Sequence, residues 1–489
     1  MLAYVALAIV SGTFLSSIQA HPTAEARGLP EVCVQIKNAV SAASDVFYFG
    51  EISYAKDVSH WASSSSQVAQ CSVEPGTAQD VGIVLQILGE TRTPFGVKGG
   101  GHASNPGFSS TTGVQIAMSR FSEVTYDASS QTAVVGSGLV WDDVYEALAP
   151  HNVNVVGGRV TGVGVAGFTL GGGYSWLSNQ YGLTVDTIAA YELVKPDGSV
   201  VTVTESSDAD LFFALKGGMN NYGIVTRFTL KTFPQGQVWG GLITFTAEHV
   251  DEVTAATAKF AKVTDPKASI ITTYNFLVGS IGVSLLIFYD APTQPAEIFD
   301  DFLAIPHFTS DIKTRDFLSL VLASPSDATA GQRAIFNTVP LVELTPTILA
   351  AVVNETQFWG SRASLLSGSF ISYDVEPFLP SLLSHSSSPS AYPPTRDKVY
   401  LPLNIYWAWG LSLSDDVLHD SVRQSTAHLE SVAVAEGQSG VDTASTYPNY
   451  AIYDTSVSRI YGDNLSRLQA IKAQVDPNNV MGLAGGFKI

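Results

Sequence analysis

Positive charge is scarce in this 489-residue chain, which has 25 lysines and arginines against 44 aspartates and glutamates and no run of basic residues. The formal net charge of −19 repels phosphate groups, so nucleic acid and anionic membrane surfaces are poor partners. Charged residues of both signs make up only 14% of the chain, and hydrophobic residues make up 45%. This balance is typical of a folded globular protein, and the length is sufficient for two lobes.

Cysteine is also rare, since Cys33 and Cys71 are the only two. Two cysteines without suitably spaced histidines do not make a zinc site, and no metal site is predicted. In an oxidising compartment the pair would form a disulfide, which would stabilise the fold by about 3–4 kcal/mol. Two free, buried thiols are the alternative.

Long apolar runs are absent after the N-terminus. Residues 1–15 are mostly apolar and small residues follow up to Ala20, which predicts a secretory signal peptide over residues 1–20. A membrane anchor is the alternative, but serines, a glycine and a threonine interrupt the roughly 20 apolar residues that a span needs. The mature protein is predicted to be secreted and free of membrane. Glycosylation sequons at Asn354 and Asn464 agree with export.

The periodicity of the apolar residues predicts an α+β fold. Apolar residues spaced by three and four predict a helix over residues 78–90, and residues 191–232 show strand, turn, strand, helix and strand in succession. A stretch rich in serine and proline at 380–394 predicts an exposed loop. Residues 400–413 alternate between two kinds of side chain, which predicts one long half-buried strand.

Glycine clusters mark the places where chemistry is expected. In Lys98-Gly99-Gly100-Gly101-His102, three residues without Cβ atoms allow backbone amides to close on a pyrophosphate, and the histidine is held against whatever the loop binds. A flexible turn followed by a surface histidine explains this motif equally well when it is taken alone.

The glycines at 162–167 match the dinucleotide fingerprint of a Rossmann fold, with Asp186 near the distance expected of its acidic residue. Gly171-Gly172-Gly173 would then fall inside the helix and weaken it by about 0.8–1.0 kcal/mol per glycine relative to alanine. Two glycine-rich loops together with Gly217-Gly218 therefore favour several loops that converge on one long cofactor over a Rossmann fold.

The order of these motifs, followed by Leu215–Thr226, Tyr447-Pro448-Asn449-Tyr450 and the closing residues 476–480, resembles the berberine bridge enzyme-like oxidases. These belong to the vanillyl-alcohol oxidase and p-cresol methylhydroxylase superfamily. The resemblance covers nearly the whole mature chain and is closest to the fungal secreted members. It implies a two-lobed FAD-binding fold of the α+β class. Residues 21–237 and 443–489 would form the FAD-binding domain, and residues 238–442 an inserted substrate-binding domain of antiparallel sheet plus helices.

The resemblance also implies that FAD is held covalently through His102, at the flavin 8α-methyl carbon. The family's second link uses a cysteine where this chain has Val160, so a single histidyl link is expected. Val163 falls at the position that gates oxygen access, and a valine there is similar to the oxygen-reactive members. Further cofactor contacts are expected at Lys98, Gly99, Gly100, Gly101, Ser137, Gly162, Gly164, Gly167, Gly172, Gly173, Ile224, Val225 and Asn449.

The implied reaction is a two-electron oxidation of a small alcohol-type substrate, either a saccharide or an aromatic metabolite. A base takes a proton while hydride passes to flavin N5, and O2 then reoxidises the flavin and yields hydrogen peroxide. Tyr447 and Tyr450 are the candidate bases, with Tyr447 favoured, and either would need a pKa lowered from about 10. The strand at 400–413 offers Asn404 and Tyr406 but no carboxylate, which argues against a carboxylate base.

Two other functions share the same sequence features. A flavin dehydrogenase that passes electrons to an acceptor other than oxygen would carry every FAD motif. A secreted flavin-binding protein without catalysis would carry them as well. The oxidase is the favoured interpretation, with the protein expected to act as a monomer.

Overall fold

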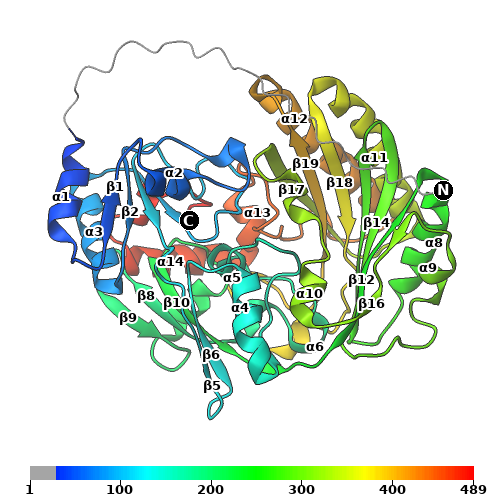
Figure 1. Cartoon of the computed structure of the whole chain (residues 1–489), viewed down its shortest axis with the longest axis horizontal. Helices are drawn as coiled ribbons and strands as arrows, with labels where there is room; N and C mark the ends of the chain where they lie inside the picture. The colour runs from blue at the N-terminus through cyan, green and yellow to red at the C-terminus, as the bar shows by residue number, and fades with distance from the viewer. Residues whose placement is uncertain (1–28) are drawn as a thin grey trace, which may run out of the picture.

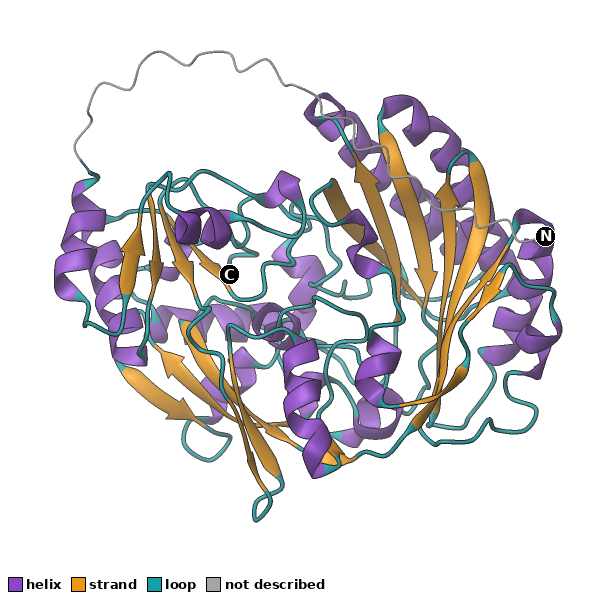
Figure 2. Cartoon of the chain, in the orientation of Figure 1, coloured by secondary structure: helices purple, strands orange, loops and turns teal. Residues whose placement is uncertain are grey.

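A computed structural model describes residues 29–489 and shows two lobes side by side (Figure 1). The predicted signal peptide lies outside the described residues. Among residues 29–489, no helix combines the length and apolar character needed to cross a membrane. The α+β class predicted from the sequence is confirmed, because helices and sheets alternate through both lobes (Figure 2).

The first sheet of the first lobe has the strand order β1-β2-β4-β3, and β2, β4 and β3 run parallel. Its strands are β1 (Asp45–Phe47), β2 (Cys71–Glu74), β3 (Phe95–Lys98) and β4 (Val114–Ala117), with helices α1 (Glu31–Ala39), α2 (Ile52–Val58) and α3 (Ala78–Thr91). The side chain of Thr77 caps α3 by accepting a hydrogen bond from the Asp80 amide. The predicted disulfide between Cys33 and Cys71 is confirmed, and it joins α1 to the start of β2.

A second, antiparallel sheet of the first lobe has the order β5-β6-β10-β8-β9. Its strands are β5 (Val124–Asp127), β6 (Thr132–Gly136), β8 (Ile188–Val194), β9 (Val200–Val203) and β10 (Ile224–Lys231), flanked by α4 (Trp141–Leu148) and α7 (Ala209–Leu215). The C-terminal helices α13 (Val457–Tyr461) and α14 (Leu465–Val475) return to this lobe (Figure 1). Leu468 and Ile471 of α14 share a core with Tyr191 and Phe228 of the sheet.

The second lobe is built on an eight-stranded antiparallel sheet with the order β15-β12-β14-β13-β18-β19-β17, and β16 pairs with β12. Its strands are β12 (Val238–Phe245), β13 (Ala268–Leu277), β14 (Ser280–Tyr289), β15 (Thr309–Ser310), β16 (Lys313–Arg315), β17 (Arg333–Leu341), β18 (Gly368–Val375) and β19 (Leu401–Trp409). Helices α8 (Val250–Phe260), α11 (Pro346–Ala363) and α12 (Asp415–Ala435) cover one face (Figure 1). The opposite face packs on the first lobe, because Ile271 and Phe288 belong to that lobe's core.

Short elements complete the chain. They are β7 (Val153–Asn154), β11 (Phe233–Pro234), α5 (Val165–Leu170), α6 (Ser178–Tyr181), α9 (Asp300–Ala304) and α10 (Phe317–Val321). Helix α5 carries part of the second glycine motif, so it is described with the site below.

Two predictions about which residues of the second lobe are buried are wrong. The strand at 400–413 was expected to be half-buried, but every residue of β19 from Leu401 to Trp409 is buried. One face of β19 packs on the helices and the other on the first lobe. The alternation of side chains along this strand therefore distinguishes two buried faces, not a buried face from a solvent-exposed one. The loop at 380–394 was expected to be exposed, yet Leu382, Leu383 and Tyr392 are buried. The ring centroids of Tyr392 and Tyr447 are 5.6 Å apart. The composition of the loop does not predict that such a contact holds it against the protein.

Candidate active site

The two glycine motifs meet backbone to backbone. Strand β3 leads directly into Gly99, Gly100 and Gly101, and Gly164 lies just before α5. A Cβ built on Gly100 would lie 2.5 Å from the Cα of Gly164, and one on Gly164 would lie 2.7 Å from the amide nitrogen of Gly100. Only glycine permits so close an approach, so these two loops converge as the sequence predicts.

Replacing Gly100 by alanine is expected to separate these loops. Because the new Cβ meets backbone rather than a flexible side chain, we expect a loss of about 1–3 kcal/mol in the free energy of unfolding and a lower flavin content per chain. Chemical denaturation and the flavin-to-protein absorbance ratio measure the two effects. A Cβ added to the exposed Gly236 would meet no atom within 4 Å, so Gly236→Ala is the matched control. Equal stability of the two variants would contradict the prediction.

His102 follows the first glycine run and lies against the indole of Trp61. The two rings are stacked with centroids 4.4 Å apart and an interplanar angle of 16°. The Nε2 atom of His102 is buried and has no hydrogen-bond partner. Burial lowers the pKa of His102 to about 4, so the imidazole is neutral at physiological pH. A neutral ring nitrogen without a protein partner is free to bond to a ligand.

Two further predicted cofactor residues, Lys98 and Ser137, differ in whether the protein already holds their polar groups. The Nζ of Lys98 donates to the Lys56 carbonyl 2.8 Å away, and its aliphatic chain lies beneath Gly101, which has φ +75°. Lys98 therefore braces the loop from behind, with its ammonium directed toward α2. The hydroxyl of Ser137 is buried with no partner, which leaves it available to a ligand.

The second motif does not form a Rossmann unit. Gly162 and Gly172 adopt φ +80° and φ +122°, and α5 between them has only six residues. Gly164 forms an antiparallel bridge with Val140 rather than closing a parallel strand. The carboxylate of Asp186 accepts from Arg396 at 2.6 Å, so it is committed to an ion pair.

The other predicted cofactor residues lie around the same loops. Val163 accepts a hydrogen bond through its carbonyl from the Trp141 amide, and Gly167 in α5 has open space where a Cβ would stand. Gly173 has φ +82°, and Ile224 and Val225 begin β10 as buried residues. Side-chain-free loops, a neutral imidazole and an unpartnered hydroxyl fit the pyrophosphate and ring of FAD.

The C-terminal motif is packed on the second glycine loop. The Nδ2 of Asn449 donates to the Phe168 carbonyl at 3.0 Å and to the Tyr447 hydroxyl at 2.9 Å. A Cβ on Gly171 would lie 2.1 Å from the Oδ1 of Asn449, so a glycine is required beneath this amide. The structure thus brings Asn449 to the predicted cofactor loops.

Tyr450 takes part in a buried triad that the sequence analysis did not find. Its hydroxyl donates to Glu376 Oε1 at 3.0 Å and accepts from Arg159 Nη2 at 2.8 Å. The same Nη2 lies 2.8 Å from both carboxylate oxygens of Glu376. Glu376 directly follows β18, and Arg159 precedes the second glycine loop. The alternation of residues 372–376 places Asp374 and Glu376 on one face of a strand, which is the signal that could have found the carboxylate.

The two tyrosines both have raised pKa values, and they differ in their contacts. Burial raises the pKa of Tyr447 to about 12, and burial together with the charge of Glu376 raises that of Tyr450 well above 10. Neither tyrosine therefore has the lowered pKa that a tyrosine base would need. Tyr450 alone contacts a carboxylate, so the geometry favours Tyr450 over Tyr447. Burial raises the pKa of Glu376 as well, while Arg159 opposes that shift.

A row of polar side chains crosses the sheet beside this triad. Thr338, Asn404, Asp374 and Thr273 are successive Cα partners on β17, β19, β18 and β13. The Oγ1 of Thr338 and the Oδ1 atoms of Asn404 and Asp374 are buried without partners. Burial, followed by the charge of Glu376, raises the pKa of Asp374 to about 7. As expected from the sequence, β19 carries no carboxylate, but Asp374 on the neighbouring β18 and Glu376 directly after it bring two carboxyl groups to this part of the second lobe.

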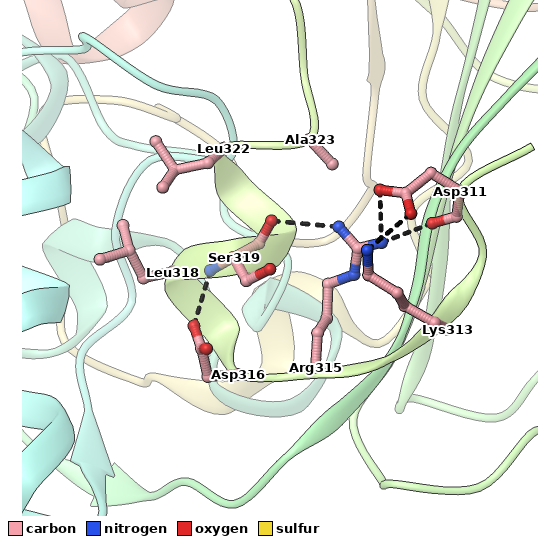
Figure 3. A pocket seen from close by; sticks show the side chains of 8 residues that line it. All are labelled: Asp311, Lys313, Arg315, Asp316, Leu318, Ser319, Leu322 and Ala323. Atoms are coloured by element: carbon pink, nitrogen blue, oxygen red, sulfur yellow. Dashed lines mark hydrogen bonds and ion pairs between the residues drawn. The ribbon is translucent and has the colours of Figure 1, made fainter.

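A separate hollow of about 400 Å³ lies at the surface of the second lobe (Figure 3). Its walls include Arg315, which donates to Asp311 Oδ2 at 2.7 Å and to the Ser319 carbonyl at 3.2 Å. Neighbouring protein groups therefore hold the guanidinium. The hollow contains none of the site residues described above, so it is not the catalytic site.

The remaining predictions concern metals and glycans. Within residues 29–489, no group of three potential metal ligands occurs. Asn354 is exposed on α11, whereas the Nδ2 of Asn464 donates to the carbonyls of Ser390 and Ala391. A glycan on Asn464 would replace one of the two Nδ2 hydrogens and so would break at least one of these two bonds.

Comparisons with known proteins agree with this site. Family models match an FAD-binding domain over residues 69–204 and a berberine and berberine-like domain over residues 446–484. The FAD-dependent monooxygenase drtC of Aspergillus calidoustus is 31% identical over 480 residues, covering 94% of this chain and 90% of that protein.

Solved structures show the same fold at lower identity. Glucooligosaccharide oxidase from Acremonium strictum aligns with a TM-score of 0.75 at 20% identity, over 92% of this chain and 97% of that one. Carbohydrate oxidase from Microdochium nivale aligns with a TM-score of 0.75 at 19% identity, over 94% and 99%. With the glycine loops, the C-terminal motif and these relatives taken together, the chain belongs to the berberine bridge enzyme-like FAD-linked oxidoreductases.

Proposed function

We propose that this protein is a secreted oxidase that holds FAD through a single covalent bond to His102. It would oxidise an alcohol-type substrate, a saccharide or an aromatic metabolite, and pass the electrons to O2 to form hydrogen peroxide. The observation that carries the proposal is the neutral imidazole of His102, whose Nε2 has no hydrogen-bond partner, beside two converged glycine loops. The disulfide and the N-terminal sequence support secretion.

The single link rests on the cysteine content. The structure of the Acremonium oxidase is described with a 6-S-cysteinyl, 8α-N1-histidyl FAD. In this chain both cysteines form the disulfide, and Val160 stands where the family's linking cysteine would be. A cysteinyl link therefore has no available thiol, and only the histidyl bond remains.

Bound FAD would supply the hydride acceptor, and the triad would handle the proton. Arg159 pairs with Glu376 and opposes the rise in its pKa that burial causes, which favours the carboxylate form, and Glu376 accepts the hydrogen bond of the Tyr450 hydroxyl. As the substrate hydroxyl gives its proton to the Tyr450 oxygen, the tyrosine gives its own proton to Glu376. The phenol never ionises, so its high pKa is no obstacle.

The polar row orients the substrate in this proposal. Asp374 and Asn404 present acceptor oxygens without partners, and Thr338 adds a hydroxyl. Buried polar atoms need hydrogen-bond partners, so this polar row favours a substrate with additional hydroxyl groups. The substrates named for the Acremonium and Microdochium enzymes, glucooligosaccharide and carbohydrate, are of that class.

The test begins with the absorbance spectrum of the purified protein before and after acid precipitation. Flavin bands that stay with the wild-type pellet and pass into the supernatant for His102→Ala are the expected result. Flavin in the wild-type supernatant would exclude the covalent link. Peroxide release in air is then measured with oligosaccharides and aromatic alcohols as probes.

A monooxygenase is the second candidate, because the relative from Aspergillus calidoustus carries that name. Mass spectrometry of products formed under ¹⁸O2 separates the two reactions, since an oxidase leaves the label in peroxide and a monooxygenase places it in the product. Flavin that substrate reduces without peroxide formation in air would instead indicate a dehydrogenase. Flavin that no probe reduces would oppose the oxidase.

A further inference from the structure

The imidazole of His102 is held by a hydrogen bond to its own backbone and by contacts with aromatic rings. The three residues before it are glycines, which offer no side chains, and its Nε2 has no hydrogen-bond partner. The nearest aromatic contact is the indole of Trp61, stacked at 4.4 Å and 16°. The next is Phe336 of β17, at 6.4 Å and 29°. The stack with Trp61 is therefore the closest fixed reference for this ring.

Trp61 is itself held from both lobes. Its amide donates to the Gly101 carbonyl at 3.0 Å, which joins it to the loop that carries His102. Its carbonyl accepts from the Gly331 amide at 2.8 Å, which joins it to the second lobe. The indole also lies 6.1 Å from Phe336 and 5.6 Å from Tyr406. Trp61 thus contacts both His102 and the sheet that carries the polar row.

We propose that Trp61 is the positioning residue for flavin attachment, and that its indole holds the His102 imidazole in the orientation from which a ring nitrogen bonds to FAD. The inference rests on the proposed covalent link. A ring that rotates freely would reach the reactive orientation only part of the time, and orientation of reacting atoms is among the largest contributions to the rate of such a step.

The attachment balances with oxygen as the oxidant. A bond forms between one imidazole nitrogen and the 8α-methyl carbon of FAD, while one N–H and one methyl C–H bond break. The electron pair of that C–H bond reduces FAD by two electrons, and the two protons complete the reduced flavin. Oxygen then removes two electrons and two protons as hydrogen peroxide. The net change is FAD, imidazole and O2 giving histidyl-FAD and hydrogen peroxide.

The test compares Trp61→Leu with Trp61→Phe, because phenylalanine keeps an aromatic face and leucine does not. Full-length proteins from riboflavin-limited cells are mixed with FAD in air, and the flavin in the acid pellet is followed over time. We expect Trp61→Leu to bind FAD but attach it about 10–100-fold more slowly than the wild type, with Trp61→Phe restoring most of the rate. Trp359→Leu, on α11 of the second lobe, is the matched control and should attach FAD at the wild-type rate.

Attachment in Trp61→Leu at the wild-type rate would overturn the inference, as would equally slow attachment in the leucine and phenylalanine variants. If neither variant binds FAD, Trp61 builds the site instead of orienting His102, which also rejects the proposal. A wild-type protein without covalent flavin would reject the proposed link itself. Covalent wild type, non-covalent His102→Ala and unaffected Trp61→Leu would reject only the role of Trp61.

Discussion

Tyr450→Phe is expected to slow the reduction of bound flavin by substrate by about 10²–10⁴-fold, and Glu376→Gln by a similar factor. The phenylalanine variant removes the hydroxyl that donates to Glu376 at 3.0 Å, so the substrate proton loses its path to the carboxylate. The glutamine variant keeps the shape but removes the final proton acceptor. Both variants should retain FAD, since neither side chain belongs to the glycine loops.

Anaerobic stopped-flow measurement of flavin bleaching, with a substrate found in the peroxide assay, gives the rate directly. Tyr447→Phe is the sharpest comparison, because the Tyr447 hydroxyl accepts from Asn449 and contacts no carboxylate. Tyr453→Phe is the matched control, since that hydroxyl accepts from Arg423 at 2.8 Å, outside the triad. A larger loss in Tyr447→Phe than in Tyr450→Phe would restore the assignment favoured from the sequence and refute the triad.

The glycine motifs of the sequence were sufficient to predict which loops converge. A glycine run has few physical explanations, and Gly100 and Gly164 are glycines because their backbones touch. The histidine after the first run and the two cysteines are also residue types with few physical explanations in their positions. These contacts join residues that are far apart in the chain, Gly100 to Gly164 and Cys33 to Cys71, but the residue types themselves point to a close backbone approach and to a disulfide.

The substrate side depends on contacts between distant residues and could not be predicted in this way. Arg159 and Glu376 are 217 positions apart, and their pairing arises only when the two lobes pack together. The same packing buries β19 on both faces, which an alternating pattern cannot distinguish from exposure on one face. A pKa is likewise a property of the assembled site, so the raised pKa values of Tyr447 and Tyr450 could not be predicted from the sequence.

Arg159→Met is expected to lower the free energy of unfolding by about 3–5 kcal/mol at pH 8, because it leaves the Glu376 carboxylate buried without its cation. Burial raises the pKa of Glu376 in the folded state, so the stability linked to this group is present below the unfolded pKa. That stability is lost as pH rises through the folded pKa. Arg159 limits the loss by lowering the folded pKa. The variant should therefore be destabilised more at pH 8 than at pH 5, as chemical denaturation at the two pH values would show.

The double variant Arg159→Met/Glu376→Gln separates lost charge pairing from lost packing. Glutamine carries no charge at either pH, so the double variant should regain stability relative to Arg159→Met at pH 8 and show little dependence on pH. Flavin reduction in Arg159→Met provides a second measurement: its acid limit should move to higher pH, because Glu376 then needs a higher pH to ionise. A destabilisation equal at both pH values, unchanged by the second substitution, would mean that Arg159 acts through its contact with the ring of Phe378 rather than through its ion pair with Glu376.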